Sequence, residues 1–514
     1  MFSKNFKYDL KSGFSVFLLA LPLCLGISIA SNFPPIAGIL TAIVGGLIAS
    51  FFGSSRLTIK GPAAGLIVIA LGAVNDLGGG DVTLGYKRAL AVGVVAAIIQ
   101  ILFALFRMAK FAEIMPPSVI HGMLAAIGII IIAKQSTVFL GVQGVSGSPL
   151  KLISMLPENI KHLNPEITLI ALISLFIILT WPTFKKLKSI PASIIVLVAT
   201  IPLSIYFDIA HPHAYHLFNS DFNIGPDFLV NLPGSLLNAA TFPLFDVITS
   251  VYSIKYIVLF ALVGSIESLL TVCAVDNLDP EKKQSDLNKD LLATGVGNLI
   301  ASLIGGLPMI SEIVRSKANI DYEAKSKYSN FFHGLFLLVS IVFIPQIIHQ
   351  ISFSALAALL IFTGFRLASP HEFKKVFQIG FDQFFLFMLT LIVTLLTDLL
   401  LGVTVGIIAK VLLHLIRGAS LSDFFSLKHT VKENEKEILV KVTGAVVFTN
   451  FLTLKNIIQN GINNKKMVKI DLSDAIIVDH TIQEKLHLFK NNVILQGISS
   501  LHAISTHEFS FKKR

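Results

Sequence analysis

Residues 20–65 read ALPLCLGISIASNFPPIAGILTAIVGGLIASFFGSSRLTIKGPAAG, and this stretch decides which kind of fold the chain can form. It holds most of two long apolar blocks, Gly13–Ala30 and Ile36–Phe52, and ends in a shorter one that follows Lys60-Gly61-Pro62. A helix that spans a membrane needs about 20 largely apolar residues. In lipid, every backbone polar group must be satisfied within the protein, so these blocks must be helices. The stretch therefore predicts a membrane protein with an interrupted third span.

The composition of the whole chain points the same way. Of 514 residues, 54% are hydrophobic and only 14% are charged, whereas soluble domains contain about 25% charged residues. The net charge of +10 comes from Lys and Arg in short loops and in the tail, so we interpret it as a topology signal and expect no nucleic-acid partner. Cys24 and Cys273 show no metal spacing and no disulfide pattern. Because the chain has no nucleophile, metal or nucleotide motif, we expect neither an enzyme nor a cofactor.

The distribution of basic residues predicts the orientation of the chain. No Lys or Arg occurs from Ser189 through Ile254, which places this segment outside the cell and both termini in the cytoplasm. We expect fourteen membrane-spanning segments in an all-α, multi-pass membrane domain, centred near residues 22, 44, 68, 97, 126, 174, 198, 264, 297, 313, 338, 361, 390 and 408.

Two of these segments are unusual. The third, Ala63–Leu71, is short and follows Gly61-Pro62, and the tenth, Met309–Ile320, follows Gly305-Gly306-Leu307-Pro308. Each is third in its half of seven. Short segments interrupted by Gly and Pro in matching positions of two halves indicate an inverted-repeat transporter with its binding site at mid-membrane. The alternative is that both are ordinary kinked helices.

The two interrupted segments predict an anion site. A helix N-terminus presents unpaired N–H groups and about half a positive charge, so two such ends together can bind an anion. The predicted contributors are the first residues of the two segments, with small side chains in the third and a hydroxyl donor, Ser311, in the tenth: Ala63, Ala64, Gly65, Met309, Ile310 and Ser311. Arg315 either supplies positive potential there or pairs with Glu312. Lys60 either attracts the anion or follows the positive-inside bias.

Glu267 is the strongest single candidate for coupling transport to an ion gradient. It lies in LFALVGSIESLLTVC, residues 259–273, which holds no other charge. A charge in mid-membrane costs about 2.5–3.5 kcal/mol on insertion scales, so it rarely occurs without a use. Thr271, four residues on, lies on the same helix face. Together they offer oxygens for a sodium ion, or a carboxyl group for a proton. The alternative is a structural ion pair of Glu267 with Lys60 or Arg315.

The composition changes after Gly418. Short runs with strand character, 438–442, 445–448, 467–472 and 493–496, alternate with segments that suit helices, 451–459 and 482–490. This alternation predicts a small α/β domain. We therefore divide the chain into a transmembrane anion-transport domain, 1–420, and a cytoplasmic domain, 430–514.

Several motifs resemble the SulP family of inorganic anion transporters. They are the opening stretch quoted above, SIESLLTVCAVDNLDP at 265–280, and LLATGVGNLIASLIGGLPMISEIVRSKANI at 291–320. In the tail, VTGAVVFTNFLTLKN at 442–456 and KIDLSDAIIVDHTIQEKLHLF at 469–489 resemble a STAS domain. The resemblance covers nearly the whole chain. Within the family it is most like the bacterial branch often associated with carbonic anhydrase.

The resemblance implies two inverted repeats of seven spans, divided into core and gate bundles, in a homodimer of the bacterial inner membrane. It implies an elevator-like cycle, with the anion at Ala63, Ala64, Ser311 and neighbouring residues and with Arg315 close by. It also implies that Glu267 and Thr271 bind the coupling ion. The sodium-dependent relatives have Asp where this chain has Glu267, so sodium and proton coupling both stay open. Val314 replaces a Ser that is frequent in the family, which shifts anion binding toward backbone groups.

We therefore expect secondary active uptake of a small inorganic oxyanion, bicarbonate first and sulfate next, with a functional link to carbonic anhydrase. A sulfate or dicarboxylate proton symporter is the nearest alternative. A nucleobase permease, which would use carboxylates in both the eighth and tenth spans, is an alternative from another class that Glu312 keeps open. A membrane-anchored STAS regulator that does not transport is a further one.

Overall fold

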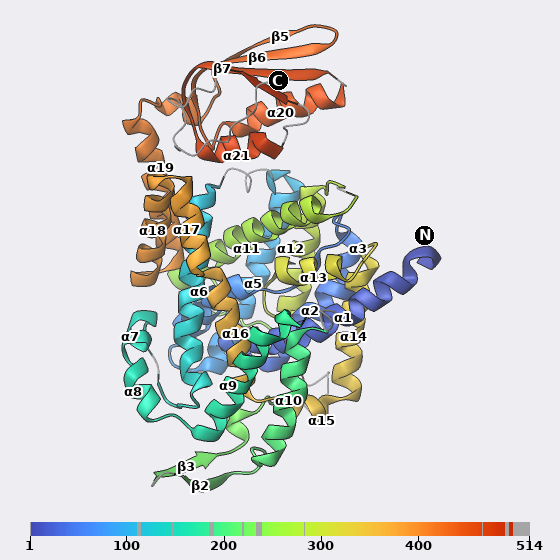
Figure 1. Ribbon diagram of the computed structural model, residues 1–514, viewed down its shortest axis with the longest axis vertical. Coiled ribbons are helices and arrows are strands. Elements are labelled where there is room, and N and C mark those ends of the chain that lie inside the picture. The colour runs from blue at the N-terminus through green and yellow to red at the C-terminus, as the bar shows by residue number, and fades with distance from the viewer. Residues whose placement is uncertain are drawn as a thin grey trace. The chain divides into compact units, whose positions relative to one another are not determined.

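The computed structural model describes residues 2–109, 115–145, 147–184, 190–217, 220–232, 239–281, 283–464, 466–488 and 493–496. The last part of the predicted 430–514 domain, from 497 onward, lies outside the described residues. The chain divides into two compact units. One contains Met1–Ala112 and Ile127–Arg366, and the other contains Glu113–Ala126 and Leu367–Arg514 (Figure 1).

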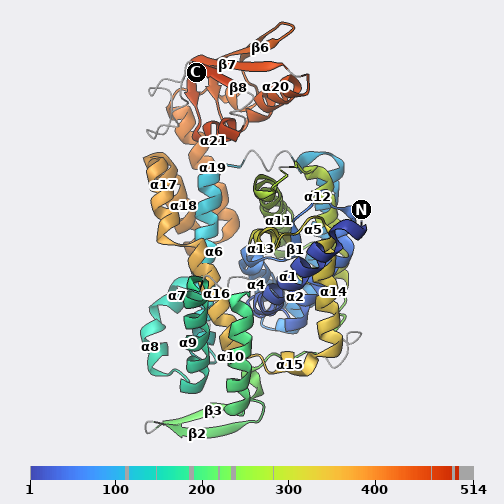
Figure 2. The same cartoon turned by 45° about the vertical axis from the view of Figure 1, so that its right-hand side comes forward.

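The first unit is built almost entirely of helices (Figure 2). They are α1 (Phe2–Ala30), α2 (Pro35–Val44), α3 (Ser50–Phe52), α4 (Ile67–Gly78), α5 (Val82–Leu105), α7 (Pro149–Ser154), α8 (Leu156–Lys161), α9 (Pro165–Thr180), α10 (Ala192–Tyr206), α11 (Val251–Leu278), α12 (Leu287–Leu303), α13 (Ile313–Asp321), α14 (Tyr328–Phe343) and α15 (Pro345–His349). A π-helical turn, Gly45–Ala49, joins α2 to α3. Two further helices, α6 (Pro117–Phe139) and α16 (Phe353–Leu367), cross the boundary between the units.

The lengths and apolar faces of these helices fit a lipid environment. Among the described residues, eight helices are long and apolar enough to cross a membrane, and four more apolar helices are shorter. On α9, the large side chains of Leu169, Leu172, Phe176 and Leu179 are all exposed at helical spacing, which is the pattern of a face toward lipid. All fourteen predicted centres fall inside helices. The chain is therefore a polytopic helical membrane protein, while the number of spans stays a prediction.

The two interrupted segments meet as a short sheet inside the first unit. Strand β1 (Ile59–Pro62) pairs antiparallel with β4 (Met309–Glu312), with Lys60 opposite Ser311 and Pro62 opposite Met309. Proline favours an extended residue before it and lacks the N–H that a helix needs. Pro62 ends β1 and Pro308 directly precedes β4, so neither segment can be helical here. Residues about 250 apart in sequence are thereby held side by side.

A β-hairpin and a cross-connection lie in the segment predicted to be external. Strands β2 (His213–Leu217) and β3 (Ser220–Ile224) pair antiparallel. Beyond them, Leu229 bridges to Ser352, and the Val230 amide donates to the Ile351 carbonyl at 2.9 Å. These bonds attach the segment after β3 to the start of α16.

The second unit contains α17 (Pro370–Ile379), α18 (Phe381–Leu396), α19 (Leu399–Ile416) and a C-terminal α/β region. Its sheet has the order β5 (His429–Glu433), β6 (Glu437–Val446), β7 (Met467–Val478) and β8 (Val493–Gln496). The β6–β7 and β7–β8 pairs are parallel, with α20 (Phe451–Asn463) and α21 (His480–Leu488) as the crossovers. The expected strands 438–442 and 445–448 are wrong as separate elements, because residues 437–446 form one strand whose register shifts at irregularities. The edge strand β5 was not predicted.

Candidate functional site

The start of the third span forms an open helix end. Ala63 is extended, and Ala64–Leu66 form a 3-10 turn that leads into α4. Ala63, at the N-cap position, provides no side-chain hydrogen bond to this turn, and no described side chain is recorded as capping it. Ala63 and Ala64 are buried, so their small side chains leave the backbone approachable only from within the protein. This is the arrangement predicted for Ala63, Ala64 and Gly65, and their role in anion binding stays a prediction.

The start of the tenth span differs from the prediction. Met309, Ile310 and Ser311 were expected to be the first helical residues, but they lie in β4, and α13 begins only at Ile313. The Met309 amide donates to Asn298 Oδ1 at 2.5 Å, and the Ser311 amide donates to Ser268 Oγ at 3.0 Å. Pairing with β1 keeps this segment extended, and side chains from α12 and α11 occupy two of its three amides.

Glu312 caps the amino end of α13 with its own side chain. Its Oε2 accepts hydrogen bonds from the Val314 amide at 3.2 Å and from the Arg315 amide at 3.5 Å. A carboxylate near a helix N-terminus is favourable because it satisfies free N–H groups and faces the positive end of the helix dipole. The two helix ends at this site therefore differ, since one is open and the other is closed by a built-in negative charge.

Arg315 is fully buried beside the same sheet. Its Nη2 donates to the Pro62 carbonyl oxygen at 3.3 Å, while Nε and Nη1 have no hydrogen-bond partner in the part of the chain that the structure describes. A Cβ added to Gly61 would lie 2.6 Å from Nη1, so a larger residue there would displace the guanidinium. An unpaired buried donor is unfavourable unless a ligand satisfies it. Two N–H-bearing nitrogens of Arg315 are thus free of partners in the described structure, and the role of this residue in anion binding stays a prediction.

Glu267 lies against the open turn. It is 8% exposed, and its Oε1 has no hydrogen-bond partner among the described residues. Its carboxylate touches the backbone of Gly65, because a Cβ added there would lie 2.3 Å from Oε1 and 2.5 Å from Oε2. The alternative that Glu267 pairs with Lys60 is wrong, since Lys60 pairs with Asp290. Arg315, the other partner considered for Glu267, donates a hydrogen bond to the Pro62 carbonyl. Thr271, one helical turn further along α11, is also buried.

The contact between Gly65 and Glu267 predicts a strong effect of a single methyl group. In Gly65→Ala, the new Cβ and the carboxylate cannot both keep their positions, and we expect the initial rate of anion uptake to fall by about tenfold or more. Uptake into proteoliposomes measures this. Gly225→Ala is the control, because its Cβ would be at ordinary contact distance, 3.4 Å, from Pro212. Equal rates for the two variants would show that Glu267 is not confined as described.

Lys60 is held in a buried polar network. Its Nζ lies 2.7 Å from Asp290 Oδ2, 2.9 Å from Ser311 Oγ and 3.2 Å from Thr294 Oγ1. Lys60 is 2% exposed and Asp290 1% exposed. The interpretation of Lys60 as a residue that follows the positive-inside bias is therefore wrong, because such a residue would lie at the membrane surface. The network joins β1, β4 and α12 around the site.

Sequence reasoning missed the residues that α12 contributes. Asp290, Thr294 and Asn298 follow one another at four-residue intervals, which places them on one helix face. Asp290 and Thr294 hold Lys60, and Asn298 holds the backbone of Met309. The polar stripe is visible in the sequence of this otherwise apolar segment and was the signal that could have identified them.

A second buried ion pair lies in the C-terminal unit. Lys410 Nζ on α19 lies 3.0 Å from Asp479 Oδ1 and donates to Thr481 Oγ1 at 3.0 Å, and His414 Nε2 is 3.5 Å from Asp479 Oδ2. Burial alone would raise the pKa of Asp479, but the charge of Lys410 and the neighbouring His414 hold that pKa below its usual range. This pair attaches the amino end of α21 to α19.

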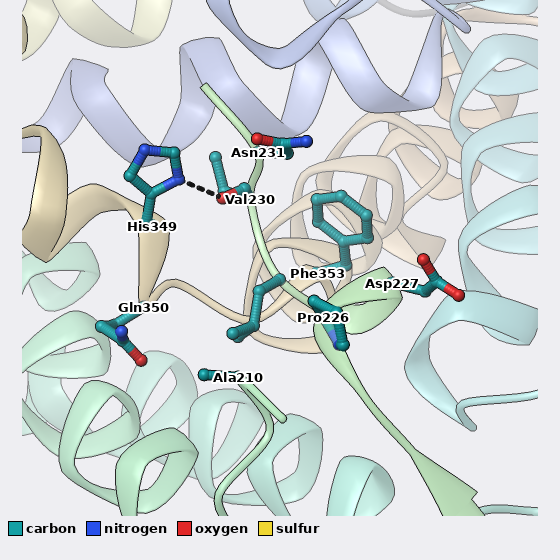
Figure 3. Close-up of a pocket in the computed structure, with 9 residues that line it drawn as sticks. Ala210, Pro226, Asp227, Val230, Asn231, His349, Gln350 and Phe353 are labelled. Carbon is teal, nitrogen blue, oxygen red and sulfur yellow. Dashed lines mark hydrogen bonds between the residues drawn. The ribbon is translucent and has the colours of Figure 1, made fainter. Parts of the chain in front are cut away.

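A cavity of about 500 Å³ lies in the first unit near the β2–β3 hairpin (Figure 3). It is lined by Ala210, Pro226, Asp227, Leu229, Val230, Asn231, His349, Gln350 and Phe353. His349 Nδ1 lies 3.2 Å from the Val230 carbonyl oxygen. None of the predicted anion or coupling residues lines it, so the candidate site remains the one at β1 and β4. In the described residues, no three His, Cys, Asp or Glu side chains are grouped as metal ligands.

Comparison with known proteins gives consistent matches. Residues 6–390 match the model of a family described as the sulfate permease family. A putative sulfate transporter of Bacillus subtilis (strain 168), YvdB, is 26% identical over 481 residues, which are 92% of this chain and 86% of that protein. The bicarbonate transporter BicA of a Synechocystis species is 25% identical over 439 residues, 85% of this chain and 74% of BicA.

Solved structures show the same fold. The transmembrane domain of a cyanobacterium bicarbonate transporter, BicA, matches with a TM-score of 0.68 and 25% identity, covering 78% of this chain and 98% of that domain. The structure of SLC26A9 matches with a TM-score of 0.70 and 14% identity, covering 98% of this chain and 86% of that one. The second similarity concerns the fold alone.

Proposed function

Because the chain belongs to the sulfate permease family, which transports inorganic anions, we propose that it carries a small oxyanion by secondary active transport. Bicarbonate is our first choice of substrate and sulfate the second. The matched relatives are transporters, so the chain is a transporter and not an enzyme. Because the family transports inorganic anions, membership of it argues against the alternative of a nucleobase permease.

The pairing of β1 with β4 is the observation that carries the proposal. It brings together the open turn at Ala63–Gly65, the unpaired nitrogens of Arg315 and the unpaired carboxylate oxygen of Glu267. Free backbone N–H groups and a guanidinium are the groups that bind oxyanions in proteins. Burial strengthens their attraction for an anion, because the surroundings screen charge less than water does.

The balance of charge supports a coupled mechanism. The opposite charges of Lys60 and Asp290 neutralise each other, and the charge of Glu312 offsets that of Arg315 on the same helix. The negative charge of Glu267 then has no opposite charge to neutralise it among these groups. A proton or a sodium ion on Glu267 makes the site neutral before the anion enters. The anion and the coupling ion therefore favour each other's binding, which is the requirement for symport.

Glu267 and Thr271 are the residues that we propose for the coupling ion. Their oxygens suit sodium, while the carboxyl group alone suits a proton. We further propose fourteen spans in two inverted repeats, an elevator-like movement, a homodimer, cytoplasmic termini and a STAS domain at the C-terminus. A functional link to carbonic anhydrase would accompany bicarbonate transport.

Uptake by purified protein in proteoliposomes tests the proposal. Radiolabelled bicarbonate and sulfate are supplied in parallel, with an inward sodium gradient, an inward proton gradient or no gradient. We expect gradient-dependent accumulation of bicarbonate above that of empty liposomes. The absence of gradient-dependent flux for both anions would contradict coupled oxyanion transport, and flux of sulfate alone would favour the second choice.

A further inference from the structure

We propose that Glu312 makes the anion site selective for singly charged anions. The inference rests on the proposed function, because it concerns the same site. It adds a residue that determines specificity by charge. The observation behind it is a difference between the two helix ends. The amides at the start of α13 donate hydrogen bonds to the Glu312 carboxylate, whereas no such cap is recorded at the turn before α4.

The geometry gives the anion one free helix end instead of two. Glu312 already occupies the amides of Val314 and Arg315 at the start of α13. The amides of Met309 and Ser311 are bonded to Asn298 and Ser268. The uncapped turn that begins at Ala64 is what remains, together with Nε and Nη1 of Arg315. An anion that binds these groups lies near the fixed negative charge of Glu312.

The fixed charges decide how much negative charge the site accepts. Glu312 lies on β4, which pairs with β1, and it caps the helix whose Arg315 side chain donates to the Pro62 carbonyl next to the open turn, so its charge acts on a ligand held there. When Glu267 carries its coupling ion, the remaining fixed charges cancel, and a single negative charge meets the positive turn and Arg315. A second negative charge on the same ligand meets no additional cation and faces Glu312. Sulfate is thus disfavoured relative to bicarbonate or nitrate, although all three are small oxyanions.

Glu312→Gln separates the charge of this residue from its capping role. The amide oxygen of Gln can accept the same hydrogen bonds from Val314 and Arg315, so the start of α13 is preserved while the negative charge is lost. Glu312→Asp retains the charge. Glu323→Gln is the matched control, because it removes a carboxylate from an exposed position just beyond the other end of α13.

The experiment measures how strongly nitrate and sulfate inhibit bicarbonate uptake into proteoliposomes at constant ionic strength. We expect sulfate to inhibit the wild type weakly, and to inhibit Glu312→Gln at a concentration lower by about tenfold, which corresponds to 1.4 kcal/mol. Inhibition by nitrate should change much less. Glu312→Asp should keep the wild-type ratio of sulfate to nitrate inhibition whatever its absolute rate, and Glu323→Gln should behave like the wild type. Equal sulfate inhibition of the wild type and Glu312→Gln would overturn the inference.

Anion-dependent thermal stability of the purified protein keeps this test independent of transport. A ligand that binds only the folded state stabilises it, and the rise in Tm grows with the logarithm of one plus the ratio of ligand concentration to Kd. We expect sulfate to raise the Tm of Glu312→Gln more than that of the wild type, with nitrate acting alike on both. If no bicarbonate flux is found but this difference is present, the proposed substrate is wrong while the charge selectivity stands. If the difference is absent, the charge selectivity is wrong.

Discussion

Glu267→Gln is expected to abolish gradient-driven accumulation of the anion, leaving the signal of empty liposomes. The glutamine amide neither takes up a proton at physiological pH nor offers a sodium ion a negative charge. The fold should tolerate the change, because Glu267 Oε1 has no hydrogen-bond partner in the described structure and the substitution removes a charge from a buried position. Exchange of labelled for unlabelled anion, which needs no coupling ion to cycle, should persist.

Three measurements separate coupling from folding in this variant: accumulation under each gradient, exchange without a gradient, and the Tm in detergent. Glu158→Gln, which removes a carboxylate from an exposed position on α8, is the matched control and should accumulate anion like the wild type. Normal accumulation by Glu267→Gln would show that Glu267 is not the coupling residue. Loss of exchange together with accumulation, at an unchanged Tm, would assign Glu267 to anion binding itself.

Lys60→Met should destabilise the first unit by about 3–5 kcal/mol, because it leaves Asp290 charged and buried with no cation. Ser311 and Thr294 would also lose the donor that they share. Both residues border the site, so anion uptake should fall as well. The shift in Tm and the recovery of folded protein after detergent extraction measure the effect.

The double variant Lys60→Met/Asp290→Asn provides the control. Removing both charges takes away the uncompensated one, and the Asn side-chain oxygen can still accept the hydrogen bond that Asp290 Oδ1 receives from the Ser55 amide at 3.2 Å. We expect this variant to recover most of the lost stability. Two results would show that the buried pair does not stabilise the contact between β1 and α12. One is a Tm of Lys60→Met equal to that of the wild type, and the other is a Tm of the double variant no higher than that of the single variant.

Most predictions that depended on local chemistry held, although 438–442 and 445–448 form one strand and β5 was missed. Apolar block length placed all fourteen span centres in helices, and strand character placed 493–496 on β8. The family resemblance is confirmed by the match over residues 6–390. At the candidate site, the errors arose where a distant segment changed the outcome. Met309–Ser311 has the composition of a helix start, but its pairing with Ile59–Pro62 makes it a strand.

By itself, the sequence determined that this is a helical membrane protein of an anion-transporter family, with two interrupted segments and one isolated acidic residue between them. The helices and the interruptions follow from hydropathy and from the backbone limits of proline, which act within a few residues, whereas the family follows from its motifs and from the match over residues 6–390. Only the tertiary structure decided that Lys60 is neutralised by Asp290, that Glu312 closes one helix end, and that Glu267 lies on Gly65 at the other. Charges and hydrogen bonds depend on which groups meet in space, and a single sequence does not specify those partners.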